Sequence, residues 1–318
     1  MQSTKLKARA LIALLAFSWA APEIGAAHLA ATSPASSRAS ETRLPTSRAE
    51  LPLPVRLREV RGRGLLISAW VAGQGPFTFA VDTGAGSLLI TPELAARTRL
   101  SSRGRTVEIG GLSRSGTVSA QQVTIRDLAL GEPNNLLATR QHRVLIVPNL
   151  PEGIDGILDP TEAYSPFGYV IDMPNRRLLA FDTRTERLRV GAEPTGGAVV
   201  RWVRESGGRR PFVRLGDNRL ALIDTGSGFG LAVSQDSADL NNRRGKAVRD
   251  LAGGAVESKR IEPSTVTIGS LVLRGVPTDI LFGAHQSVPV LLGRDALYPF
   301  RLTFDPASRL IEIAPVGQ

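Results

Sequence analysis

Short runs of aliphatic and β-branched residues, broken by Gly, Pro and Asn, make up most of the chain from Arg56 onward. Examples are residues 65–71, 77–81, 144–147 and 169–171. Apolar runs of this length that end in turn-forming residues are typical of strands rather than helices. The pattern therefore predicts a mainly β protein with few helices.

Two of these runs belong to an internal repeat. The first copy, FTFAVDTGAGSLLI, covers residues 77–90, and the second, RLALIDTGSGFGLAV, covers residues 219–233. Each copy places an apolar run directly before Asp-Thr-Gly, and the two aspartates, Asp82 and Asp224, are 142 positions apart. A repeat of this length indicates a duplicated domain rather than a solenoid, whose units are much shorter.

The ends of the two copies also correspond. FGYVIDMPNRRLLAF at residues 167–181 parallels FRLTFDPASRLIEI at residues 300–313. Each segment has the composition of a strand, a turn that begins with Asp, and a returning strand. The repeats together predict an N-terminal lobe at residues 55–190 and a C-terminal lobe at residues 191–318.

The N-terminus has the features of an export signal. Three basic residues precede the apolar stretch 10–21, and small residues at 25–27 provide a cleavage site, so we predict a signal peptide at residues 1–27 and a periplasmic or secreted protein. A spanning helix needs about 20 apolar residues, so no stable membrane span is expected after cleavage. An uncleaved anchor remains an alternative. Residues 28–54 are expected to form a flexible leader, either a propeptide or a spacer.

The composition excludes several classes of function. The chain has no cysteine, so neither disulfides nor thiolate chemistry is available. Its net charge of +10 comes from scattered basic residues rather than one basic run, so we expect no nucleic-acid partner. The three histidines, His28, His142 and His285, form no recognisable triad or metal spacing, and we expect the last two at the surface or in loops. We therefore predict no metal and no cofactor.

Each half supplies one carboxylate in an Asp-Thr-Gly loop. Hydrolysis of an amide needs a base that takes a proton from water and an acid that protonates the carbonyl oxygen. Two neighbouring carboxyl groups provide both, because repulsion prevents them from ionising together. We therefore predict Asp82 and Asp224 as catalytic residues. The loop residues expected to support them are Thr83, Gly84, Thr225, Gly226 and Ser227.

On these motifs the chain resembles the pepsin and retropepsin group of aspartic peptidases, and more closely the bacterial retropepsin-like proteins that carry both lobes in one polypeptide. The resemblance covers residues 57–315 and includes an apolar segment behind each loop, DGIL at 155–158 and LLGRDAL at 291–297. It implies an all-β, bilobal acid protease fold with two duplicated β-barrel lobes and a central cleft. It also implies an aspartic endopeptidase that cleaves an extended peptide or protein substrate and acts as a monomer, an internal pseudo-dimer.

Members of this group close over the substrate with β-hairpin flaps. The Gly-rich candidates are Gly110 and Gly111 in the first half and Gly253 and Gly254 in the second, although plain hairpin turns would have the same composition. The chain departs from the group at Asp159, where the family usually has Gly. A carboxylate there would perturb Asp82 or alter the packing of its loop.

Two hypotheses follow from the differences between the halves. Ser227 stands where the first loop has Ala85; if its hydroxyl donates to Asp224, that carboxyl group ionises more readily than Asp82. Asp159 also leaves an alternative function open, a catalytically impaired relative that binds or scaffolds peptides in the same groove. The presence of both complete Asp-Thr-Gly loops favours the peptidase.

Overall fold

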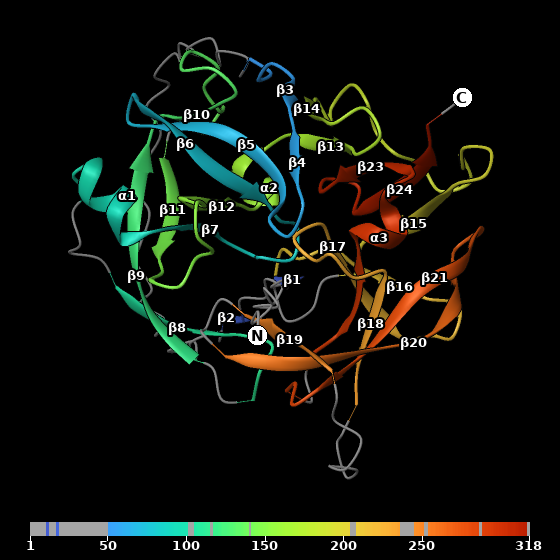
Figure 1. Ribbon diagram of the computed structural model, residues 1–318. Coiled ribbons are helices and arrows are strands. Elements are labelled where there is room, and N and C mark those ends of the chain that lie inside the picture. Colours follow the sequence, from blue (N-terminus) through green and yellow to red (C-terminus); the bar gives the residue numbers. More distant parts are fainter. Residues whose placement is uncertain are drawn as a thin grey trace, which may run out of the picture.

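The computed structural model describes residues 11–12, 17–18, 50–100, 105–114, 117–139, 141–203, 208–235, 245–250, 254–285 and 288–316. Strands dominate these residues, and they form three main sheets (Figure 1). The helices found among them are short: α1 (Pro92–Arg97), α2 (Pro160–Ala163) and α3 (Arg294–Leu297). The prediction of an all-β protein is confirmed.

The first sheet, on the left in Figure 1, is built mainly from the first half of the chain. It has ten strands in the order β10-β5-β6-β12-β7-β11-β9-β8-β2, with β4 paired to β5. The strands are β2 (Phe17–Ser18), β4 (Arg58–Val60), β5 (Gly64–Val71), β6 (Gln74–Val81), β7 (Leu88–Ile90), β8 (Thr106–Gly110), β9 (Thr117–Arg126), β10 (Leu128–Leu130), β11 (Gln141–Ile146) and β12 (Gly156–Leu158).

The second sheet, at the lower right in Figure 1, is built mainly from the second half. It has eight strands in the order β1-β19-β20-β21-β18-β22-β17-β16. The strands are β1 (Leu11–Ile12), β16 (Phe212–Arg214), β17 (Leu220–Asp224), β18 (Leu231–Ser234), β19 (Lys246–Arg249), β20 (Ala255–Ile268), β21 (Leu271–Phe282) and β22 (Val290–Gly293).

A third sheet of six strands joins the two halves. Its order is β15-β24-β23-β13-β14-β3, with β3 (Val55–Arg56), β13 (Gly168–Asp172), β14 (Arg177–Phe181), β15 (Ala198–Arg201), β23 (Phe300–Asp305) and β24 (Leu310–Pro315). The two predicted hairpins are β13–β14 and β23–β24, and they meet where β13 pairs antiparallel with β23. At this seam the rings of Tyr169 and Phe304 stack with centroids 4.6 Å apart.

The hydrophobic core is built from the apolar runs of the strands, which are buried over most of their length in β5 and at the end of β6. In β5 and β6 the buried side chains include Leu65, Phe77 and Phe79, and they belong to one cluster that continues through the third sheet into the second half. Burying large apolar side chains of this kind supplies the main driving force for folding. The continuous core holds the two halves in a fixed relation, which matters because each half carries one of the aspartates. The predicted boundary at residue 190 stays a prediction.

The strands β1 and β2 lie within the predicted signal peptide. Strand β1 pairs parallel with β19, and β2 pairs antiparallel with β8. The rest of residues 1–27 and nearly all of the leader lie outside the described residues. Among the residues that are described, no helix has the length and apolar character needed to cross a membrane.

Candidate active site

Asp82 lies immediately after β6, at the point where the buried strand enters a loop. Its backbone N–H donates to the carbonyl of Leu158 at 2.9 Å, which continues the parallel pairing of β6 with β12. The side chain is completely buried. The apolar strand therefore carries a carboxyl group into the interior of the molecule, a placement that costs free energy unless partners are provided.

Asp224 occupies the matching place in the second half. It ends β17, which pairs parallel with β22, and it lies opposite Gly293 in the register of these strands. Its side chain is also completely buried. The repeated motif in the sequence thus corresponds to a repeated arrangement of paired strands in the structure.

The glycines of the two loops bring the carboxyl groups face to face. Each carboxyl group accepts a hydrogen bond from the glycine of its own loop: Gly84 N–H donates to Asp82 Oδ1 at 2.7 Å, and Gly226 N–H donates to Asp224 Oδ1 at 3.0 Å. A Cβ on Gly84 would lie 2.8 Å from Cγ of Asp224, and a Cβ on Gly226 would lie 2.3 Å from Cγ of Asp82. Both positions require glycine because the opposite aspartate fills the space that a side chain would occupy.

The two threonines interlock the loops. The Thr83 hydroxyl donates to the carbonyl of Ile223 at 2.6 Å, and the Thr225 hydroxyl donates to the carbonyl of Val81 at 3.2 Å. Each hydroxyl also accepts the backbone N–H of the opposite threonine, at 3.1 and 3.2 Å. Since the threonine side chain is stiff at χ1, this set of four hydrogen bonds holds the carboxyl groups in register.

Burial and proximity perturb both carboxyl groups. Burial raises the pKa of Asp82 well above its usual range, and the charge of Asp224 raises it further. Burial also raises the pKa of Asp224, to about 6, but the neighbouring Asp82 carboxyl group, the backbone N–H of Ser227 and the charge of Arg294 oppose that rise. Oδ2 of each carboxyl group is buried and has no hydrogen-bond partner among the described residues. Asp224 accepts two backbone N–H groups and Asp82 accepts one, which favours the charge on Asp224 and the proton on Asp82.

The structure corrects the expectation that the Ser227 hydroxyl donates a hydrogen bond to Asp224. Its backbone N–H, not its hydroxyl, donates to Asp224 Oδ1 at 3.0 Å, and the hydroxyl accepts the N–H of Phe229 at 3.2 Å. The pKa of Asp224 lies below that of Asp82, in the direction that the hypothesis expected. The donor that it named, the hydroxyl, is wrong. A backbone donor could not be distinguished from a hydroxyl donor in the sequence, because the loop conformation decides which group faces the carboxylate.

Arg294 is a site residue to which the sequence analysis assigned no role. Its guanidinium group donates through Nη1 to the carbonyls of Thr225 at 2.6 Å and Gly226 at 3.0 Å. Burial lowers the pKa of Arg294, and the negative charge of Asp224 opposes that effect. The cation supports the second loop from behind and favours the ionised form of Asp224. The sequence contains this arginine directly after Gly293 in the LLGRDAL segment, where its position next to the second loop could have indicated a role.

Asp159 lies directly behind the first loop and is 1% exposed. Its Oδ1 accepts the N–H of Thr161 at 2.9 Å and so caps helix α2. Burial raises the pKa of Asp159 to about 7, and a charge on Asp159 raises the pKa of Asp82. The structure thus accommodates this departure from the family pattern within a capped helix turn.

The flap candidates belong to two hairpins. Gly110 ends β8 of the hairpin β8–β9, Gly111 follows it, and Gly254 precedes β20 of the hairpin β19–β20. Gly253 lies outside the described residues. The tips approach each other below the centre of the molecule in Figure 1. A Cβ on Gly111 would fall on the carboxyl group of Asp250, which belongs to the other hairpin.

The tips of the two hairpins contact each other through the carboxylate of Asp250 and the side chain of Leu112. The Asp250 side chain accepts the N–H of Ser113 and the N–H of Gly254, each at 2.8 Å. Leu112 is completely buried in an apolar cluster that otherwise comes from the second half of the chain. A β-bridge between Ser113 and Ala284 continues this contact. This contact could not be predicted from the sequence, because nothing local indicates which distant segment a hairpin tip will meet.

The expectation that His142 and His285 lie at the surface or in loops is correct for His285 and wrong for His142. His285 is exposed in a loop, as predicted, whereas His142 is buried in β11 with 2% exposure. Burial lowers the pKa of His142, so the neutral form is favoured. Within the described residues no cluster of three or more His, Cys, Asp or Glu side chains could hold a metal ion. The expectation of a metal-free reaction stays a prediction.

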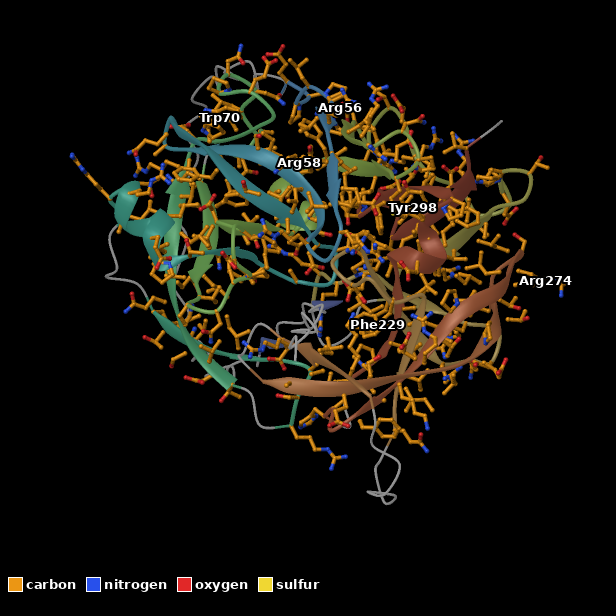
Figure 2. The ribbon with its side chains drawn as sticks, viewed as in Figure 1. Arg56, Arg58, Trp70, Phe229, Arg274 and Tyr298 are labelled. Atoms are coloured by element: carbon orange, nitrogen blue, oxygen red, sulfur yellow. The ribbon has the colours of Figure 1, made fainter. Side chains whose placement is uncertain are left out.

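The basic side chains are spread over the surface. Figure 2 shows Arg274 projecting at the edge of the second sheet on the right, far from Arg56 and Arg58 near the top centre of the view. All three belong to strands and are exposed. The expectation that no nucleic acid binds stays a prediction.

One comparison with known proteins bears on this geometry. Residues 67–158 match the family model described as Aspartyl protease. The matched segment runs from β5 through the first Asp-Thr-Gly loop to the end of β12, so it contains Asp82. No curated protein matches the chain. The match and the all-β sheets support an aspartyl protease family, and with it hydrolysis of peptide bonds.

Proposed function

We propose that the chain is a single-chain, two-lobed aspartic endopeptidase of the pepsin and retropepsin type. The observation that carries the proposal is the meeting of two buried carboxyl groups, one from each half, across loops that only glycine allows. The repeated strand pairing behind the loops, β6 with β12 and β17 with β22, supports two duplicated lobes that each supply one aspartate.

Hydrolysis would proceed by the two carboxyl groups in opposite protonation states. The Asp224 carboxylate takes a proton from a water molecule, and the water oxygen forms a bond to the carbonyl carbon of the scissile peptide. Asp82 gives its proton to the carbonyl oxygen, so a neutral tetrahedral diol results. When the diol collapses, the C–N bond breaks as Asp224 gives the amide nitrogen the proton that it took from water. Asp82 takes a proton from a diol hydroxyl, the acid and amine products leave, and the pair returns to its starting state. The pKa order of the pair supports this assignment of roles.

The substrate class is proposed to be an extended peptide or an unfolded protein segment. The hairpins β8–β9 and β19–β20 cover the region between the halves, and their outer edges already pair with the short strands β2 and β1. Edges that accept a strand are suited to bind a peptide through main-chain hydrogen bonds. Both aspartates come from one chain, so a monomer contains the whole site. Export to the periplasm or the medium is part of the proposal and rests on the sequence alone.

The experiment is cleavage of a mixed peptide library by the purified protein, from about pH 3 to about pH 8, with products identified by mass spectrometry. The proposal predicts cleavage at internal peptide bonds, with a defined preference on both sides of the bond. A folded protein that binds library peptides at every pH without cleaving them would instead establish the alternative, an impaired peptide-binding relative.

A further inference from the structure

The two halves differ at one pair of matching positions behind the loops. In the second half Asp224 lies opposite Gly293 in the register of β17 and β22. In the first half Val81 lies opposite Leu158, so the next pair along the strands is Asp82 and Asp159. Asp159 is therefore the counterpart of Gly293. By the same register Pro160 is the counterpart of Arg294.

Local packing shows why the second half requires glycine at this position. A Cβ on Gly293 would lie 2.4 Å from the carbonyl oxygen of Phe229, 2.9 Å from the carbonyl oxygen of Ser227 and 3.1 Å from the Ser227 hydroxyl. Two of these three atoms belong to the backbone, so a change of the Ser227 side chain alone would not make room. The first half instead holds Asp159 with its side chain buried.

The ionisable groups behind the pair therefore differ. Arg294 is a cation, whereas Asp159, with a pKa raised by burial to about 7, is neutral on the acid side and negative on the alkaline side. Behind Asp224 the Arg294 guanidinium group donates to two carbonyls of the loop. Behind Asp82 lies the Asp159 carboxyl group, whose Oδ2 is buried and has no hydrogen-bond partner within the described part of the chain. A charge on Asp159 acts on Asp82, whereas Arg294 acts on Asp224.

The residues around Asp159 provide no direct ion pair for its carboxyl group within the described part of the chain. The charged groups that face it are Glu162 on helix α2 and Arg209, which are 3.8 Å apart at their closest atoms. Tyr169 of β13 also faces it and hydrogen-bonds through its hydroxyl to Thr161 at 2.9 Å. Glu162 opposes ionisation of Asp159, and Arg209 favours it. With Arg209 engaged by Glu162, no cation among the described residues contacts Asp159 directly.

We propose that Asp159 is a positioning residue which, with Arg294 on the opposite side, keeps the shared proton on Asp82 and so fixes Asp224 as the base. The inference rests on the proposed function, since it assigns roles within the same pair. Asp159 is buried behind the loop and acts through Asp82. An electric field directed across the pair would replace the symmetric sharing expected of two identical loops.

The first test is the pH profile of kcat/KM for Asp159→Asn, a change that keeps the shape and the helix-capping oxygen. Without a carboxylate behind Asp82 the shared proton is lost more readily as the pH rises. On the alkaline side kcat/KM is therefore expected to fall about three- to tenfold below wild type, while on the acid side it stays within about twofold. Asp172→Asn is the matched control, because Asp172 is a buried carboxyl group that contacts Asn175 in a distant turn. Its profile should keep the wild-type shape.

A second measurement does not depend on cleavage or on the variant folding. Carboxyl ¹³C chemical shifts of the wild-type protein, followed against pH, are expected to show Asp82 losing its proton at higher pH than Asp224. An Asp159→Asn profile that coincides with wild type on the alkaline side would overturn the proposal, as would Asp82 titrating below Asp224. A wild type that cleaves nothing would refute the proposed function alone, because the titration order would still test this inference.

Discussion

The interlocked threonines provide the sharpest prediction about stability. Thr83→Val replaces the hydroxyl with a methyl group of similar size and leaves the packing almost unchanged. Two buried backbone groups then lose their partner: the carbonyl of Ile223, which accepts the hydroxyl at 2.6 Å, and the N–H of Thr225, which donates to it at 3.1 Å. Each unsatisfied buried group costs about 1–3 kcal/mol. For two groups we expect a loss of about 2–6 kcal/mol in the free energy of unfolding.

The assay is equilibrium unfolding in urea, followed by tryptophan fluorescence and circular dichroism. Thr98→Val is the matched control, since Thr98 is also buried and its hydroxyl donates to the carbonyl of Leu94 at 2.8 Å. That carbonyl keeps a backbone donor, the N–H of Thr98 itself, so the control should lose less than about 1 kcal/mol. Equal losses in the two variants would refute the reasoning that the loops depend on this interlock.

Three further predictions concern the pair and the hairpins. Because Asp224 must be ionised and its pKa is raised to about 6, kcat/KM should decline as the pH falls through about 6, and an optimum near pH 3 would contradict this. Asp250→Ala removes the acceptor of two N–H groups at the hairpin tips, so their hydrogen exchange should quicken about tenfold or more, with Asp250→Asn intermediate. Gly226→Ala would place a Cβ 2.3 Å from Cγ of Asp82, so kcat/KM should drop about 100-fold or more in a folded protein. The control Gly191→Ala adds a carbon that meets nothing within 4 Å but strains a backbone at φ +84°, so it should lose stability and keep the kcat/KM of its folded molecules.

The sequence predicted the parts of the fold that depend on local pattern and on repetition. Short apolar runs broken by turn-forming residues indicated strands, and the two Asp-Thr-Gly copies indicated loops that end equivalent strands. The structure places Asp82 and Asp224 together because the strands behind them, β12 and β22, repeat the same parallel pairing. Duplication therefore carried the long-range information that a single sequence normally lacks.

The contacts that the sequence could not predict join segments far apart in the chain. His142 was expected at the surface because a lone histidine gives no indication of which strand face it occupies, and β11 turns it inward. The sequence analysis assigned no role to Asp250, yet its carboxylate accepts an N–H from a hairpin 137 positions away. The donor from Ser227 was missed because the orientation of a loop peptide is decided by its three-dimensional neighbours.

The central claim is that catalysis requires both carboxyl groups, and its most direct test compares Asp82→Asn with Asp224→Asn. Each variant keeps the size of the side chain, so each should fold and give the wild-type circular dichroism spectrum. The account predicts that either substitution alone lowers kcat/KM for a cleaved peptide by about 1,000-fold or more, because neither carboxyl group can act as acid and base together. Full activity in one folded variant would contradict a two-carboxylate mechanism.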